Sequence, residues 1–145
     1  MGPFDMSLKN IALLVIAVLI LAVLIWGAAF ITKRRPGKRL NTEHFAARWQ
    51  ALQKMCADKN TWPLAIIDAD KLLDDALKKS HVKGKTMGER LVTVQRDLSN
   101  NDGVWFAHKL RNKLVHEQYD GLKERDVKEA LVGFRQALKD LGALK

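Results

Sequence analysis

The sequence predicts an all-α protein that consists of one N-terminal transmembrane helix and a compact bundle of four or five helices. The first reason is an uncharged apolar run of 21 residues, "IALLVIAVLILAVLIWGAAFI", at positions 11–31. The second is that apolar side chains beyond residue 41 recur every three or four positions, the period of amphipathic helices, whereas the alternation typical of strands is almost absent. Third, about 105 residues follow the basic stretch after the apolar run, enough to bury a core without disulfides or metals.

The apolar run has the properties of a membrane anchor. As a helix that rises about 1.5 Å per residue it is roughly 30 Å long, the thickness of the hydrocarbon core of a bilayer. Secretory signal peptides have shorter apolar cores that follow their positive charges. Here only Lys9 precedes the run, offset by Asp5, while "KRRPGKR" (33–39) follows it directly. The positive-inside rule therefore places the N-terminus outside and the rest of the chain in the cytoplasm.

This topology divides the chain into four regions. We expect a short extracytoplasmic N-terminus (1–10), a transmembrane helix (11–31), a basic juxtamembrane linker (32–41) and a cytoplasmic helical bundle (42–145).

The net charge of +9 is unevenly distributed. Five positive charges belong to "KRRPGKR", and residues 40–145 hold 19 Lys and Arg against 15 Asp and Glu, a net of +4. Topology and attraction to anionic lipid headgroups thus account for most of the excess. The remainder permits a nucleic-acid-binding surface without requiring one. The single cysteine, Cys56, excludes a disulfide within the chain, suits a reducing cytoplasm, and is expected to be a small core residue.

Periodicity and capping residues place the first two helices of the bundle. The first is expected at about 42–58, with Asn41 or Thr42 as its N-cap. The second starts near Thr61, because Pro63 is tolerated in a first turn, and it ends before "KKSHVKGK".

Three further helices complete the predicted bundle. "TMGE" (86–89) forms a capping box, which opens a shorter helix that extends to about Leu98. The turn cluster "SNNDG" precedes a fourth helix at about 104–117. The fifth begins at Asp126 and runs to about Leu141, with the strongest amphipathic pattern in the chain.

Several common types of active site do not fit the sequence. "KGKT" (83–86) lacks both the upstream glycine and the preceding strand of a phosphate-binding loop. Four aspartates of the second helix, Asp68, Asp70, Asp74 and Asp75, could suggest a magnesium site. Lys71 with Asp75, Asp74 with Lys78, and Asp75 with Lys79 are all spaced four apart, which predicts a solvated, salt-bridged helix face instead. The histidines lack metal-ligand spacing, and no nucleophile elbow occurs. We therefore expect no metal and no cofactor.

The stretch "AHKLRNKLVHE" (107–117) gathers polar side chains on one helix. His108, Asn112 and His116 follow one another at intervals of four and therefore stack along one face, and Arg111 lies three after His108. Arg111 and His116 are about 140° apart around an ideal helix. They converge within one chain only if the arginine wraps around the helix or if the helix ends before His116.

These residue types suit the cleavage of RNA without a metal ion. In that reaction the 2′-hydroxyl of the substrate is the nucleophile. A histidine can accept or donate a proton near pH 7. An arginine stays ionised and binds the phosphate with two donors, so it stabilises the charge that develops in the transition state. An asparagine can orient a phosphate oxygen or a hydroxyl.

"RNKLVH" (111–116) resembles the R-polar-x-x-x-H motif of HEPN domains, which are compact all-helical bundles of many prokaryotic toxins and RNA-defence proteins. The resemblance covers roughly residues 42–141, including the single helix after the motif. It implies that Arg111 holds the scissile phosphate, that His116 is the acid or base, and that Asn112 positions the substrate. HEPN domains usually dimerise with two motifs facing each other, which implies a homodimer. His108 and Lys109 precede the motif and Lys113 lies within it; these three residues are expected to contact nucleic acid.

Two functions follow from these observations. The first is a membrane-anchored, HEPN-like, metal-independent endoribonuclease of a toxin–antitoxin or phage-defence system; its partners would be RNA, a second copy, membrane lipid and a protein inhibitor. The alternative is a non-catalytic, membrane-tethered helical module that dimerises and binds a protein or a nucleotide. A module that acts on lipid through "KRRPGKR" gains little support, since a basic linker beside a membrane span is expected from topology alone.

Overall fold

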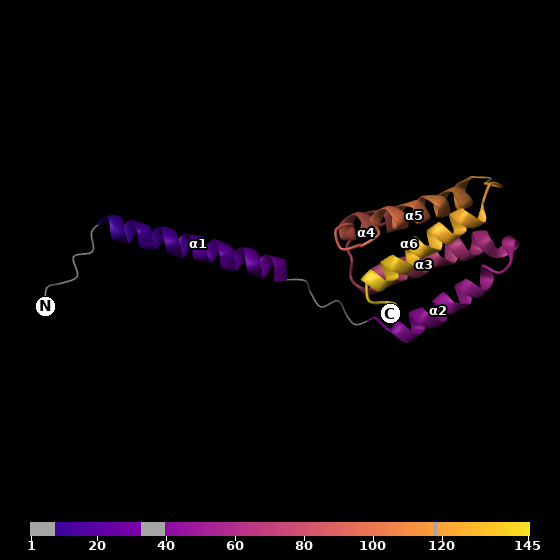
Figure 1. The fold of residues 1–145 in the computed structure, drawn as a ribbon, viewed down its shortest axis with the longest axis horizontal. Helices are drawn as coiled ribbons and strands as arrows, with labels where there is room; N and C mark the ends of the chain where they lie inside the picture. Colours follow the sequence, from indigo (N-terminus) through magenta and orange to yellow (C-terminus); the bar gives the residue numbers. More distant parts are fainter. Residues whose placement is uncertain (1–7, 33–39, 118) are drawn as a thin grey trace. The chain divides into compact units, whose positions relative to one another are not determined.

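The computed structural model describes residues 8–32, 40–117 and 119–145, and the side chains of 10–26, 40–117 and 119–145. All regular secondary structure within these residues is helical (Figure 1), so the predicted all-α class is confirmed for them. The chain divides into two compact units, Met1–Pro36 and Gly37–Lys145. Most of the predicted N-terminal region (1–10) and of the basic linker (32–41) lies outside the described residues.

The described residues of the first unit form one helix, α1 (Leu8–Thr32). Its described large apolar side chains are exposed, from 43% for Ile11 to 76% for Trp26. The side chains of 27–31, the end of the predicted transmembrane helix, lie outside the described residues. No helix formed by the described part of the chain reaches the length and apolarity that crossing a bilayer requires.

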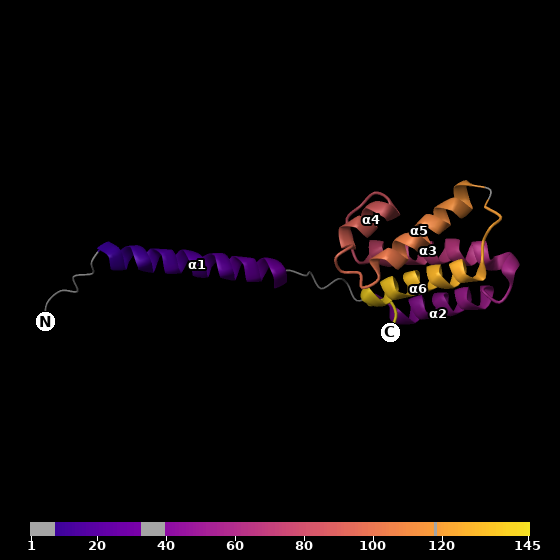
Figure 2. The same ribbon diagram turned by 45° about the horizontal axis from the view of Figure 1, so that its top comes forward.

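The second unit is a helical bundle. Its elements are α2 (Thr42–Met55), a 3-10 turn η1 (Lys59–Thr61), α3 (Trp62–Lys79), α4 (Met87–Val94), α5 (Asn101–His116) and α6 (Glu124–Asp140). Helix α3 packs against α2, α5 and α6, and α5 packs most extensively against α6 (Figure 1). The short α4 lies at one end of the bundle (Figure 2). Five α-helices in the described bundle agree with the predicted four or five.

The core of the bundle is formed by apolar side chains that the helical period brings to one face of each helix. The largest fully buried ones are Phe45, Ile66, Leu73, Leu77, Leu91, Val104, Phe134 and Leu138. Burying each contributes on the order of 1.5–3 kcal/mol relative to exposure. Helices α5 and α6 approach so closely at Gly133 that a Cβ there would lie 2.3 Å from the carbonyl oxygen of Gly103. This crossing therefore requires a glycine.

Helix α2 begins as predicted but ends earlier. The side chain of Asn41 caps it by accepting a hydrogen bond from the backbone N–H three residues later, at 3.1 Å. The helix ends at Met55 rather than near residue 58 because groups of the next helical segment bind its last carbonyls. The Thr61 hydroxyl donates to the carbonyl of Met55, and the Trp62 indole donates to that of Cys56 at 2.9 Å.

The other predicted helix ends require small corrections. The Thr86 hydroxyl accepts from the backbone of Glu89 at 3.2 Å, but the Glu89 carboxylate accepts from Lys85, at 2.7 Å, so only half of the predicted capping box forms. Helix α4 ends at Val94 rather than near residue 98. Helix α5 starts three residues before the predicted 104, since the side chain of Asn100 caps it. Helix α6 starts two residues before Asp126, whose carboxylate accepts a backbone hydrogen bond from within the first turn.

Candidate functional site

A pocket of about 450 Å³ lies between α3, α4 and α5. Its lining residues are Asp70, Lys71, Asp74, Thr86, Met87, Gly88, His108, Arg111 and Asn112. Three of the six site residues predicted from the sequence, His108, Arg111 and Asn112, therefore share one pocket.

The floor of the pocket is a buried carboxylate–imidazole pair. Asp70 is 3% exposed and His108 is 8% exposed. The Oδ1 atom of Asp70 lies 2.8 Å from Nδ1 of His108. The sequence placed Asp70 on a solvated face, and this expectation was wrong. Asp70 follows Ile66 by four positions and precedes Leu73 by three, so it lies on the apolar stripe that α3 turns toward the other helices.

Arg111 and Asn112 close a ring of contacts with this pair. Nη1 of Arg111 donates to Oδ1 of Asn112 at 2.9 Å, and Nδ2 of Asn112 lies 3.4 Å from Nε2 of His108. Nε of Arg111 lies 3.4 Å from Oδ2 of Asp70, an ion-pair distance, but its N–H is not aligned for a hydrogen bond with any described residue. The arginine side chain is 25% exposed. It is thus both anchored inside and accessible from the pocket.

A second ion cluster borders the pocket. Two nitrogens of Arg90 contact Oδ1 of Asp74: Nε donates a hydrogen bond to it at 2.8 Å, and Nη2 lies 2.7 Å from it. Nζ of Lys78 lies 2.6 Å from the other carboxylate oxygen, Oδ2. Burial alone would raise the pKa of Asp74, but hydrogen bonds from Lys78 and Arg90 and their positive charges outweigh it and lower the pKa. Asp74 is therefore an ionised carboxylate with its own cations, Lys78 and Arg90.

The neighbouring aspartates of α3 follow the prediction in part. Asp74 with Lys78 and Asp75 with Lys79 form the expected i,i+4 ion pairs. Lys71 instead lies 3.6 Å from Asp68, one turn before it.

The other three predicted site residues do not line this pocket. His116 is the last residue of α5 and is exposed; within the described part of the chain, nothing forms a hydrogen bond or ion pair with its imidazole. Lys109 and Lys113 line a separate pocket of about 250 Å³ together with Tyr119, whose ring centroid is 5.9 Å from Nζ of Lys113. The structure thus does not bring Arg111 and His116 together within one chain.

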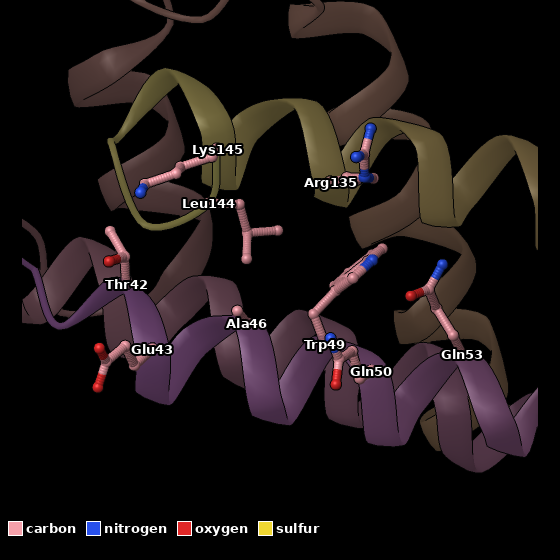
Figure 3. A pocket seen from close by; sticks show the side chains of 9 residues that line it. All are labelled: Thr42, Glu43, Ala46, Trp49, Gln50, Gln53, Arg135, Leu144 and Lys145. Atoms are coloured by element: carbon pink, nitrogen blue, oxygen red, sulfur yellow. The ribbon is translucent and has the colours of Figure 1, made fainter.

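A further pocket, of about 360 Å³, separates α2 from the end of the chain beyond α6 (Figure 3). Trp49, Arg135 and Leu144 form much of its wall. The indole nitrogen of Trp49 is buried and has no hydrogen-bond partner among the described residues. No histidine lines this pocket, so it holds no side chain that ordinarily exchanges protons near pH 7. The pocket between α3, α4 and α5, which His108 lines, is therefore the better candidate for a reaction that needs acid–base catalysis.

Cys56 is half-buried at the end of α2, where its thiol donates to the carbonyl of Leu52 at 3.3 Å. Burial raises the pKa of this thiol. Its surroundings accordingly favour the neutral, unreactive form.

Comparisons with protein-family models, with curated proteins and with solved structures found no match to the chain. The HEPN resemblance therefore rests on the motif at 111–116 and on the order of the helices around it.

Proposed function

We propose that this chain is a membrane-anchored, HEPN-like, metal-independent endoribonuclease that cuts RNA at the inner face of the membrane. One observation carries the proposal: a guanidinium, an amide and an imidazole, from Arg111, Asn112 and His108, meet in a single pocket. Arginine supplies a permanent positive charge for a phosphate, and histidine supplies proton transfer near neutral pH. These are the groups that cleavage by the 2′-hydroxyl of the substrate needs.

Arg111 has a second terminal nitrogen with which to bind phosphate. Nη1 is engaged by Asn112 and Nε faces Asp70, whereas Nη2 makes no hydrogen bond to a described residue. In the proposed reaction Arg111 holds the scissile phosphate, and Asn112 keeps the guanidinium in place while it orients the substrate. His116, exposed one turn after Asn112, is the acid or base that acts from the solvent side or on the phosphate bound by a second copy of the chain.

The nucleotides next to the scissile bond would lie along α5. Lys109 and Lys113 are exposed cations on this helix. The pocket that they line includes the half-buried rings of Phe106 and Tyr119. Lysines that contact phosphates and aromatic faces that stack on bases are how proteins bind single-stranded nucleic acid without reading its sequence.

Membrane attachment is part of the same proposal. The uncharged run of residues 11–31 has the length of a membrane span, and the described large apolar side chains of α1 are exposed. A tether would raise the local concentration of the chain, so a dimer of modest affinity would suffice. Such an enzyme would suit a toxin–antitoxin or phage-defence system in which a protein inhibitor restrains it.

The activity is tested with the full chain in dodecyl maltoside micelles, a fluorescently labelled single-stranded RNA and excess EDTA. We expect cleavage products that end in a 2′,3′-cyclic phosphate and a 5′-hydroxyl, and no cleavage of DNA of the same sequence. Arg111→Ala should reduce the rate by about 10²–10³-fold. Arg96→Ala, which removes an exposed arginine outside the pocket, should leave the rate unchanged.

The alternative is a non-catalytic binding module. The observation that favours it is that Asp70 contacts both His108 and Arg111, which would also satisfy a purely structural role. A folded chain that binds the RNA in fluorescence anisotropy but never cuts it would support this alternative and refute the nuclease.

A further inference from the structure

The ring of contacts in the pocket determines which nitrogen of His108 carries its proton. Arginine has only hydrogen-bond donors. The atom of Asn112 that lies 2.9 Å from Nη1 of Arg111 must therefore be the amide oxygen. This fixes the orientation of the amide, which is otherwise ambiguous in asparagine side chains.

The orientation of Asn112 leaves its NH₂ group toward His108. Nδ2 of Asn112 lies 3.4 Å from Nε2 of the imidazole, and an amide nitrogen only donates, so Nε2 must be the acceptor. The proton of the neutral ring is then on Nδ1, from which it is donated to Oδ1 of Asp70 at 2.8 Å. The contact of Nε2 with Asn112 and the contact of Nδ1 with Asp70 thus each indicate the same neutral tautomer, with the proton on Nδ1.

The surroundings of Nε2 leave it open to a ligand. At 3.4 Å the contact with Asn112 is long for a hydrogen bond, so a substrate hydroxyl can replace it. Gly88 of α4 is close to this nitrogen, since an added Cβ there would lie 3.9 Å from Nε2. The absence of a side chain at Gly88 keeps this approach free. The Trp105 ring packs against the imidazole edge-on, with centroids 6.0 Å apart, and holds its plane.

We infer that His108, held by Asp70, is the general base of the proposed ribonuclease, an inference that rests on the proposed function. Nε2 takes the proton of the 2′-hydroxyl, and the 2′-oxygen forms its bond to phosphorus. The bond between phosphorus and the 5′-oxygen breaks, and that oxygen takes a proton from the general acid, His116 in the proposed reaction. Asp70 keeps the Nδ1–H tautomer in place and stabilises the imidazolium that forms.

The test separates a base from an acid by changing the leaving group. The substrate is a DNA strand with one ribonucleotide, whose scissile bond ends in either a 5′-oxygen or a 5′-sulfur. A thiolate leaves without a proton, so the sulfur substrate does not need the acid but still needs the base. With the full chain in dodecyl maltoside, His108→Gln should lower the single-turnover rate by about 10²–10⁴-fold on both substrates. His116→Ala should lower it on the oxygen substrate only.

The matched control is His44→Gln, an exposed histidine on α2, which should cut both substrates at the parent rate. A parent-like rate for His108→Gln overturns the inference. So does recovery of His108→Gln on the sulfur substrate, which would make His108 the acid.

A second variant keeps the test valid if His108→Gln does not fold. Gly88→Ala leaves His108 intact but places a methyl group 3.9 Å from Nε2. Because alanine favours a helix more than glycine does, the melting temperature should rise. The rate should nevertheless fall at least about tenfold, because the methyl group occupies space beside Nε2 that the substrate needs for a well-aligned approach. An unchanged rate would count against His108 as the base.

One measurement is independent of activity. The ¹⁵N shifts of the histidine rings distinguish the two neutral tautomers, and the resonances of His108 are assigned by their loss in His108→Gln. We expect the neutral ring to carry its proton on Nδ1, and a proton on Nε2 would overturn the inference. If the tautomer is as expected but the parent cuts no RNA, the nuclease proposal fails and the base role fails with it, while the hydrogen-bond assignment holds.

Discussion

Replacing Asp70 with asparagine tests whether the pocket is held together by matched donors and acceptors. The two side chains have nearly the same shape, but asparagine has one acceptor where aspartate has two. In the parent, one carboxylate oxygen faces the Nδ1–H of His108 and the other faces the guanidinium of Arg111. The amide NH₂ of asparagine must point at one of these two donors, whichever way it is turned.

The expected cost follows from that mismatch. A buried donor without an acceptor costs about 1–3 kcal/mol, and the positive charge of Arg111 also loses its partner. Since the Arg111 side chain is 25% exposed, water can solvate part of that charge. We therefore expect Asp70→Asn to lower the free energy of unfolding by about 2 kcal/mol, roughly 10 °C in melting temperature for a domain of this size. The control, Asp75→Asn, breaks an exposed pair and should cost no more than about 0.5 kcal/mol.

Urea unfolding followed by tryptophan fluorescence measures both effects, and a double-mutant cycle with Arg111→Met isolates the cause. Without the arginine, the asparagine can turn its oxygen to His108 and its NH₂ toward the vacated space. Asp70→Asn should then cost at least about 1 kcal/mol less in the Arg111→Met background than in the parent. Equal costs in both backgrounds, or a cost below about 0.5 kcal/mol in the parent, would refute the argument.

Three further perturbations test the bundle and its surface. Because the pKa of Asp74 is lowered in the folded chain, its contribution to stability is complete above the ordinary value of 3.8 and is lost as the pH falls through the folded value. Asp74→Asn should therefore be about 1.5–3 kcal/mol less stable than the parent at pH 7, and in thermal unfolding this difference should shrink as the pH falls below 3.8. Replacing Lys109 and Lys113 by alanine should weaken RNA binding and reduce the slope of log K against log salt by roughly 0.7 for each lost phosphate contact, as measured by anisotropy. Gly133→Ala should cost about 1–3 kcal/mol in urea unfolding, because the new methyl group would meet the Gly103 carbonyl.

The sequence predicted the helices well where local signals determine them. Val127, Phe134 and Leu138 recur at the helical period and are all buried in α6. Asn41 and Asn100 cap their helices because an N-cap needs only a side chain and a backbone N–H three residues later. The early end of α2 could not be predicted in this way, since the groups that bind its last carbonyls belong to the next helical segment.

The candidate site was predicted in part. Arg111, Asn112 and His108 were named from one helix, where spacing alone decides which side chains are neighbours. Asp70 was missed as a site residue because its partner is 38 positions away and the lysines around it suggested a solvated face. Its position on the apolar stripe of α3 was the available signal. A carboxylate there must find a donor on a facing helix, because burying it unpaired would be too costly.

Burial of Asp70 also connects the fold to the proposed chemistry. A carboxylate in the core is tolerated only with a hydrogen-bonded partner, and the partner that α5 supplies is an imidazole with a second nitrogen. Satisfying the carboxylate fixes the proton on Nδ1, which leaves Nε2 as the basic atom that faces the pocket. His108 is thus oriented by packing of α3 against α5 and needs no rearrangement when substrate binds. His116 is at the exposed end of the same helix. One histidine fixed in the core and one open to solvent suit a reaction in which the first takes a proton inside the pocket and the second delivers one to a leaving group at its edge.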